Sequence, residues 1–301
     1  MSIFKGSGVA IITPFKENGE VDYNTLNNLI DFQIENNTDS IIICGTTGES
    51  STLSELEHIK CIEACINHVN GRVPVIASTG SNATKTAIEL SKEAEKLGAD
   101  GLLCVTPYYN KTSQEGLKRY YGNIANSVNI PIIMYNVPSR TGVNINPDTA
   151  IEIAKQHDNV VAIKEASGNI SNVAEILSSG KLDVYSGNDD QTIPMLSLGG
   201  IGVISVIANI FPKETHNMVM NYLNGDVKKS KEIQLNMLKL CKALFSDVNP
   251  IPVKKACEIL GLSNGYLREP LIELDKAKTK VLRKEIDDFK IISIAKNFKN
   301  N

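Results

Sequence analysis

Eight short apolar runs, rich in β-branched residues, recur along the first two-thirds of the chain, and amphipathic stretches separate them. The runs are GVAIIT (8–13), SIIICG (40–45), VPVIAS (73–78), GLLCVT (101–106), PIIMYN (131–136), VVAIKE (160–165), LDVYSG (182–187) and GVISVI (202–207). Each is nearly continuous in apolar character, which is typical of parallel strands covered on the outside by helices. This alternation constrains the fold more than any other feature, and it predicts an α/β protein with a parallel sheet.

The stretches between the runs place apolar residues at helical spacing. Asp22 and Asn82 stand at N-cap positions, and Gly98 stands where a helix would end. Ser54 and Glu57 have the spacing of a capping box. The predicted helices span 22–36, 54–69, 82–97, 114–127, 147–157, 170–178 and 191–198, and another follows Pro212.

Eight strand–helix units in about 225 residues predict a (β/α)8 TIM barrel. A doubly wound sheet usually carries a glycine-rich fingerprint after its first strand, and this chain lacks one there. The last part of the chain has no strand-like run, but it has helical patterns at 253–260 and 276–292. We therefore expect a barrel catalytic domain over residues 1–225 and a C-terminal helical region over 226–301.

Composition excludes several classes of partner. The chain has 301 residues with 31 Lys+Arg and 34 Asp+Glu, and a net charge of −3 argues against nucleic acid or an anionic membrane. No apolar run approaches the roughly 18 residues of a spanning helix. The N-terminal apolar stretch stops at Pro14 without a small-residue cleavage site, so we expect no signal peptide. Six scattered cysteines predict buried thiols in a reducing cytoplasm.

A metal site is not expected. His58, Cys61, Cys65 and His68 fall on one helical face, but they span about 15 Å of helix. One straight helix cannot wrap four such ligands around a tetrahedral zinc ion. Carbonyl chemistry in this chain would therefore run through a lysine.

In a (β/α)8 barrel the active site lies at the carboxyl ends of the strands, and one of these ends carries Lys164. Strand alternation places this side chain on the face of Val160 and Ala162, with Val161 and Ile163 opposite. If the bulkier pair faces the helices, Lys164 points into the barrel. Burial then disfavours the ammonium and favours the free amine that a Schiff-base nucleophile needs. With the opposite alternation, Lys164 lies on the outer surface or at the rim.

Other polar side chains follow neighbouring strands. Tyr109 and Tyr135 come after the fourth run and near the end of the fifth, and Thr47 after the second could hydrogen-bond to both phenols. Arg140 could bind a carboxylate through two parallel hydrogen bonds. Each of these residues could instead have no role in catalysis: a tyrosine could simply pack at the barrel mouth, and an arginine in a loop could be solvated.

Three segments resemble the signatures of the 4-hydroxy-tetrahydrodipicolinate synthase (dihydrodipicolinate synthase) family. They are GTTGES (45–50), YNVPSRTG (135–142) and VAIKEASG (161–168). The resemblance extends to YY (108–109), GVIS (202–205) and NPIPVK (249–254). It implies a class I lyase that condenses pyruvate with L-aspartate-4-semialdehyde on the route to diaminopimelate and lysine, without a cofactor beyond the covalent Schiff base.

The resemblance also implies catalytic roles. Lys164 would form the Schiff base with pyruvate, and Tyr135 would donate and accept protons. Thr46 would act in the same catalytic group, and Thr47 and Tyr109 would complete a proton relay. Because this tyrosine typically reaches across from a neighbouring subunit in the family, the dimer would be the catalytic unit, and a dimer of dimers is expected.

Substrate contacts follow in the same way. Thr46, Thr47, Gly187 and the carbonyl of Ile204 would hold pyruvate, and Arg140 would hold the carboxylate of the semialdehyde. N-acetylneuraminate lyase and the 2-keto-3-deoxy sugar acid aldolases are the alternative, because they share the barrel and the lysine. Their loop usually lacks this arginine. A catalytically silent barrel that only binds a keto acid is a further alternative, which turnover would exclude.

Regulation by lysine is the point at which the chain departs from the family. Feedback-sensitive members bind lysine at a subunit interface, and the matching positions here are Ser50, His58, Asn82 and Tyr108. Glu55 stands where a histidine is often found, and Thr86 where a glutamate would neutralise the amine of the effector. We therefore predict weak or absent inhibition by lysine.

Overall fold

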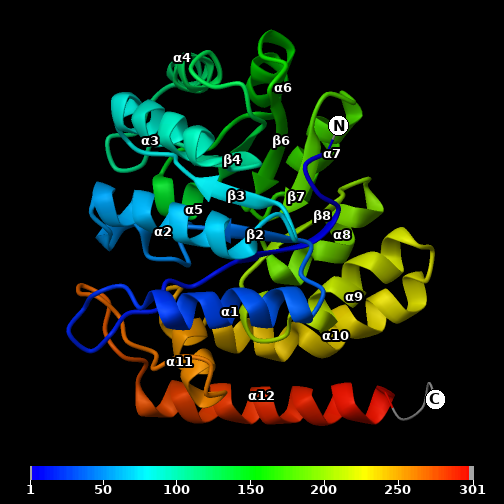
Figure 1. The fold of residues 1–301 in the computed structure, drawn as a ribbon. Coiled ribbons are helices and arrows are strands. Elements are labelled where there is room, and N and C mark those ends of the chain that lie inside the picture. The colour runs from blue at the N-terminus through cyan, green and yellow to red at the C-terminus, as the bar shows by residue number, and fades with distance from the viewer. Residues whose placement is uncertain (1, 298–301) are drawn as a thin grey trace.

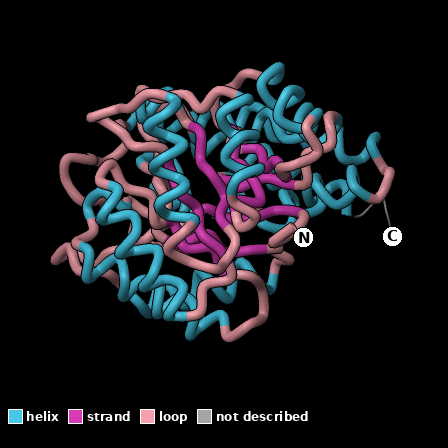
Figure 2. The backbone as a smooth tube through the Cα atoms, turned by 90° about the horizontal axis from the view of Figure 1, so that it is seen from above, coloured by secondary structure: helices cyan, strands magenta, loops and turns pink. Residues whose placement is uncertain are grey.

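The computed structural model describes residues 2–297, in which eight parallel strands close into a barrel that helices surround (Figures 1 and 2). The strands pair in chain order, and the eighth returns to pair with the first. They are β1 (Gly6–Ala10), β2 (Ser40–Ile43), β3 (Val75–Ser78), β4 (Gly101–Val105), β5 (Ile132–Asn136), β6 (Val160–Glu165), β7 (Asp183–Ser186) and β8 (Gly202–Ser205). Each overlaps one predicted run, so the (β/α)8 fold is confirmed.

The helices match the predicted periodic stretches, and α5 and α10 are additional to those. They are α1 (Tyr23–Glu35), α2 (Glu55–Val69), α3 (Thr84–Leu97), α4 (Gln114–Ala125), α5 (Pro138–Thr141), α6 (Pro147–Gln156), α7 (Ile170–Ser178), α8 (Thr192–Ser197), α9 (Pro212–Leu223), α10 (Val227–Leu244), α11 (Ile251–Ile259) and α12 (Lys276–Asn297). No helix within residues 2–297 is long and apolar enough to cross a membrane.

Local capping explains where several helices begin and end. The Asp22 side chain accepts a hydrogen bond from a backbone N–H of α1, and Ser54 forms the predicted capping box with Glu57. Gly98 ends α3 in the left-handed conformation. The predicted Asn82 cap is wrong, because α3 begins one residue later and the residue at its N-cap is Ala83.

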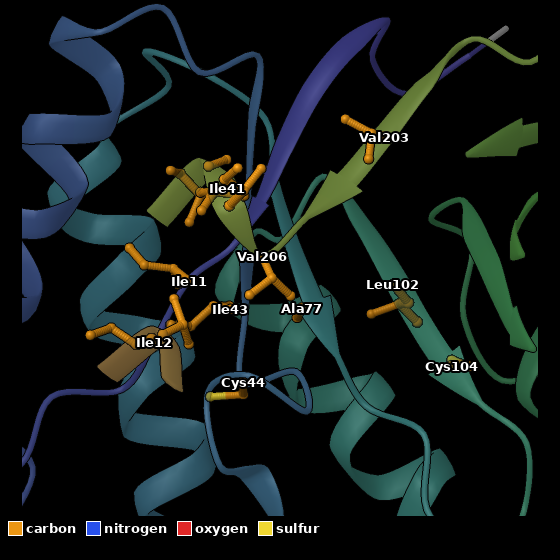
Figure 3. Packing of buried hydrophobic residues seen from close by; sticks show 14 of the residues in the cluster. Ile11, Ile12, Ile41, Ile43, Cys44, Ala77, Leu102, Cys104, Val203 and Val206 are labelled. Atoms are coloured by element: carbon orange, nitrogen blue, oxygen red, sulfur yellow. The ribbon is translucent and has the colours of Figure 1, made fainter. Parts of the chain in front are cut away.

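Both faces of the sheet are buried, which is why the strand sequences are almost continuously apolar. Alternate residues such as Ile41, Ile43 and Leu102 pack outward against the helices in one large cluster (Figure 3). The intervening residues, among them Ile42 and Leu103, fill the barrel in a second cluster. The barrel interior is therefore a packed core and not an open channel.

One prediction about β6 is wrong in a specific way. Its register with β5 shifts by one residue between Val160 and Ala162, which marks a bulge. Val160 consequently lies in the outer cluster with Ile163, and Val161 packs against the inner cluster. The expected alternation holds only after the bulge, where Ala162 and Lys164 share the inner side.

The helices after α9 cover one side of the barrel (Figure 1). There α12 packs along α10 and α11, and the rings of Phe211 and Phe289 meet edge to face with centroids 4.8 Å apart. A domain boundary after residue 225 would fall between α9 and α10, which pack directly against each other. That boundary stays a prediction.

Candidate active site

A cavity of about 900 Å³ lies at the carboxyl ends of the strands, where the fold class places active sites. It is lined by residues that follow β2, β5, β6 and β7 and by part of the segment between α10 and α11. Most of the predicted catalytic and binding residues line it, namely Thr46, Thr47, Tyr135, Arg140, Lys164 and Gly187. Tyr109 and Ile204 are not among its lining residues.

Lys164 lies inside the barrel. Its side chain is only 6% exposed, and it lines the cavity above the inner cluster that contains Ala162 and Ile133. The register pairs it with Tyr135 on β5, and its Nζ lies 4.3 Å from the centroid of that ring. The alternative in which Lys164 lies on the outer surface is therefore wrong. The amine stands against an aromatic face in a largely apolar surrounding.

Gly187 leaves the space that the Lys164 side chain occupies. A Cβ atom at this position would lie 3.2 Å from Cε of Lys164 and 2.6 Å from Cβ of Ala166. Its N–H donates to the carbonyl of Glu165 at 2.8 Å, so the backbone itself is fixed. A side chain at residue 187 would push directly against the lysine.

Thr47 and Arg140 meet a residue that sequence reasoning did not single out as part of the site. The Oγ1 atom of Thr47 accepts a hydrogen bond from Nδ2 of Asn249 at 3.0 Å. Nη2 of Arg140 donates to the backbone carbonyl of the same asparagine at 3.0 Å. Asn249 begins NPIPVK (249–254), one of the segments that resemble the family. Its contact with Thr47 joins residues 202 positions apart, and no local pattern in the sequence indicates it.

Tyr109 is separated from the other predicted relay residues within one chain. Its side chain is 91% exposed, and its φ of +69° is a left-handed conformation that bulky residues rarely adopt. The preceding Tyr108 lines the cavity instead. Hydrogen bonding of Thr47 to both phenols is therefore not formed by a single chain.

Ile204 lies on the last strand, β8, and Asp189 lies between β7 and β8. Ile204 on β8 contributes its side chain to the inner cluster, and the prediction for it concerns the carbonyl. The buried carboxylate of Asp189 accepts from Oγ of Ser205 at 2.5 Å and from the N–H of Val206 at 3.0 Å. Burial raises the pKa of Asp189, and these hydrogen bonds and the Lys164 charge act in the opposite direction.

A buried ion pair anchors the loop that carries Thr47. The Glu49 carboxylate contacts the ammonium of Lys254, and each of the two side chains is 1% exposed. Nζ of Lys254 also donates to the carbonyl of Tyr266 at 2.8 Å and lies 4.1 Å from the Phe15 ring centroid. Burial lowers the pKa of Lys254 to about 8. Sequence reasoning missed this pair because its members are far apart in the chain.

Most of the positions that the family resemblance associates with lysine binding line the same cavity. The cavity is lined by Ser50, Glu55, His58, Thr86 and Tyr108, and Asn82 is not among its lining residues. Nε2 of His58 contacts the Ser78 carbonyl at 2.7 Å, and burial lowers the pKa of this imidazole. His68 contacts Asp31 at 2.9 Å, so the two histidines of α2 have separate partners.

Comparison with known proteins agrees with the geometry. The model of the dihydrodipicolinate synthetase family matches residues 3–288. A 4-hydroxy-tetrahydrodipicolinate synthase from Lachnoclostridium phytofermentans is 58% identical over 288 residues, with 95% of this chain and 98% of the relative covered. A crystal structure of a dihydrodipicolinate synthase superposes with a TM-score of 0.94 at 50% identity, covering 95% of this chain and 99% of that chain.

A further solved structure is the chloride-inhibited dihydrodipicolinate synthase from Acinetobacter baumannii complexed with pyruvate. It matches with a TM-score of 0.93 at 43% identity, covering 95% of this chain and 99% of that chain. These relatives favour the synthase over the sugar-acid lyases, and the family predicted from the sequence motifs is confirmed. The chain belongs to the dihydrodipicolinate synthetase family.

Proposed function

We propose that the chain is a class I lyase that condenses pyruvate with L-aspartate-4-semialdehyde to 4-hydroxy-tetrahydrodipicolinate. The observation that carries this proposal is the amine of Lys164, which lines the cavity at the carboxyl ends of the strands and faces the Tyr135 ring. The names of the relatives support the reaction, and the pyruvate complex of one of them supports the first substrate.

The reaction begins when the free amine of Lys164 adds to C2 of pyruvate, and loss of water leaves an imine. Loss of a methyl proton gives an enamine, whose carbon forms the new bond to the aldehyde carbon of the second substrate. The amine of that substrate then closes the ring onto C2, and the Lys164 amine leaves. No cofactor takes part in these steps.

Each of these steps moves a proton, and Tyr135 is the group we assign to that task. It is buried at the end of β5 next to Lys164, within reach of a bound keto acid. Thr46, Thr47 and Gly187 line the same cavity. We assign these three residues and the carbonyl of Ile204 to the binding of pyruvate. We assign to Thr47 the transfer of protons between Tyr135 and Tyr109.

Arg140 gives the site its preference for a semialdehyde with a carboxylate. Its guanidinium is fixed on one side by the Asn249 carbonyl and lines the cavity mouth. A bidentate contact from the remaining N–H groups suits a carboxylate better than a sugar hydroxyl. This arginine and the named relatives favour the synthase over N-acetylneuraminate lyase and the 2-keto-3-deoxy sugar acid aldolases.

We assign Tyr109 to the active site of a neighbouring copy of the chain. An almost fully exposed tyrosine beside the cavity-lining Tyr108 suits a contact across a subunit interface. The catalytic unit is then a dimer, and two dimers form a homotetramer. The six buried free thiols suit a reducing compartment, so we place the enzyme in the cytoplasm.

Inhibition by lysine is expected to be weak or absent, because Thr86 brings no carboxylate and Glu55 brings a negative charge in place of an imidazole. Half-inhibition at sub-millimolar lysine in a steady-state assay would contradict this expectation.

The test of the proposed function is reduction with borohydride in the presence of pyruvate, followed by intact-mass and peptide mass spectrometry. We expect one pyruvate-derived adduct, on Lys164, and a cyclic product when the semialdehyde is supplied. An adduct without turnover would indicate a different aldehyde partner. No adduct on the folded protein would overturn the Schiff-base assignment and favour the silent barrel.

A further inference from the structure

We infer that Asn249 is a positioning residue, which holds the Thr47 hydroxyl in the orientation that proton transfer at Lys164 requires. The inference rests on the proposed function and deepens it. Asn249 belongs to the segment between α10 and α11, outside the barrel strands, and it lines the cavity together with Thr47. It touches no reacting atom in the proposed reaction, so its effect would pass through its neighbours.

The contact between the two side chains is buried. Thr47 is 2% exposed and Asn249 is 6% exposed, and Nδ2 of the asparagine lies 3.0 Å from Oγ1 of the threonine. Within the part of the chain that the structure describes, this is the hydrogen bond that holds the Thr47 hydroxyl. The orientation of the hydroxyl therefore depends on one amide group.

The direction of this hydrogen bond determines what the hydroxyl can do. A hydroxyl has one proton and two acceptor lone pairs, and the amide N–H of Asn249 occupies one of those lone pairs. The proton of Thr47 and its second lone pair are then left for partners in the cavity. A group that relays a proton needs both, since it accepts on one side and donates on the other.

A second contact of Asn249 uses its backbone and not its side chain. The carbonyl of Asn249 accepts the hydrogen bond from Arg140, so a substitution at residue 249 leaves this acceptor in place. Side-chain variants at this position should therefore impair proton transfer while they spare the contact to the carboxylate of the semialdehyde. A change of the Asn249 side chain should therefore lower kcat, and KM for the semialdehyde, which depends on Arg140, should stay nearly the same.

The segment that carries Asn249 is itself held against the loop of Thr47. The N–H of Lys254 donates to the carbonyl of Pro250 at 2.9 Å, and the Lys254 side chain is paired with Glu49. The loop and the start of α11 are thus joined at two points, by the contact between Asn249 and Thr47 and by the ion pair between Lys254 and Glu49, and this restricts the motion of the Asn249 amide. A fixed support of this kind is what accurate placement of a relay group requires.

The experiment compares four variants, Asn249→Ala, Asn249→Asp, Thr47→Val and Asn249→Ala/Thr47→Val, in steady-state kinetics. We expect Asn249→Ala to lower kcat by about 10-fold to 100-fold, with KM for the semialdehyde changed by less than about twofold. Asn249→Asp has the same shape but no N–H donor, so it reverses the hydrogen bond and should lower kcat as much. In the Thr47→Val background, Asn249→Ala should cost nothing further.

Asn159→Ala is the matched control, because it removes an amide that donates to two backbone carbonyls far from the cavity, and its kcat should equal that of the wild type. Exchange of the methyl protons of pyruvate in D2O, followed by NMR, measures enamine formation without the semialdehyde. We expect this exchange to slow in Asn249→Ala and Asn249→Asp. Because the exchange assay contains no semialdehyde, it tests proton transfer independently of the condensation step.

Two results overturn the inference, and neither resembles a failure of the proposed function. One is a wild-type kcat and wild-type exchange in Asn249→Asp. The other is an Asn249→Ala loss of equal size with or without the Thr47 hydroxyl, which would show that the asparagine acts elsewhere. A failure of the proposed function would instead appear in the wild-type enzyme, as absence of the Lys164 adduct or of turnover.

Discussion

Lys164 packs between the apolar inner cluster of the barrel and an aromatic face. The inner cluster includes Ala162, and Nζ of the lysine lies 4.3 Å from the centroid of the Tyr135 ring. The side chain also has little room on the side of Gly187, because a Cβ atom at that position would lie 3.2 Å from Cε of the lysine. Substitutions next to this lysine should therefore affect the reaction mainly by changing the space available to its side chain or the charge near its amine.

Gly187→Ala is expected to slow the enzyme by a steric effect. The new methyl group would lie 2.6 Å from Cβ of Ala166, which forces the local backbone to shift, and 3.2 Å from Cε of Lys164, which displaces the lysine slightly. We expect about 10-fold to 100-fold slower adduct formation with pyruvate and a loss of about 1–3 kcal/mol in unfolding free energy. Time-resolved borohydride trapping and denaturant titration measure the two effects. Wild-type trapping kinetics in this variant would contradict the expectation.

At the scale of elements, the loop after β2 contacts the segment that leads into α11. Two buried contacts connect them, one between Thr47 and Asn249 and one between Glu49 and Lys254. An ion pair in such a place is costly to break on one side, because the remaining charge is left buried. Removing both charges together costs much less.

Lys254→Met should therefore lower the free energy of unfolding by about 3–5 kcal/mol. The double variant Lys254→Met/Glu49→Gln should recover most of this loss, since no unpaired charge remains inside. Denaturant titrations of the wild type and the two variants make the comparison. A double variant as unstable as Lys254→Met would show that the unpaired charge of Glu49 is not the cause of the loss.

The elements themselves were largely predictable from the sequence, because burial on both faces makes the strands apolar and capping residues such as Ser54 mark the helices. The bulge in β6 was not predictable, since an extra residue in a strand leaves the apolar run unchanged. The placement of Lys164 followed from its position near a strand end. The contact of Asn249 with Thr47 could not be found, because nothing local links positions so far apart.

On the scale of the whole molecule, Arg268 connects the C-terminal helical region to α2 and to the segments around Gly19 and Thr52. Its guanidinium pairs with Glu57 on α2, donates to the carbonyls of Gly19 and Thr52, and lies 4.4 Å from the Phe15 ring centroid. The C-terminal helical region is therefore bound to the opposite end of the sequence by charge as well as by packing.

The ion pair between Arg268 and Glu57 should weaken in acid. The hydrogen bond from Arg268 lowers the pKa of Glu57 from 4.5 to about 2, so the ionised carboxylate stabilises the fold above pH 4.5 and loses this effect as the pH falls toward 2. Glu57→Gln should be less stable than the wild type at pH 7, and the difference should shrink between pH 4.5 and 3. Denaturant titrations across this range test it. A difference that stays constant with pH would contradict it.

The proposed exchange of Tyr109 between subunits predicts complementation. Lys164→Ala and Tyr109→Phe each impair every site of their own homodimers. A hybrid dimer would contain one site with both intact residues, so co-expression should restore about a quarter of the wild-type activity. Activity in purified hybrids no higher than in the separate variants would show that Tyr109 serves its own chain.

The long separation between Thr47 and Asn249 also sets an order of events during synthesis. The nucleophile and the phenol beside it leave the ribosome well before the asparagine, which follows α10. A nascent chain thus exposes a strand-end lysine whose relay threonine is still unsupported. The last part of the chain supplies the support that we infer for this threonine, so the complete active site forms only after residue 249 has been synthesised.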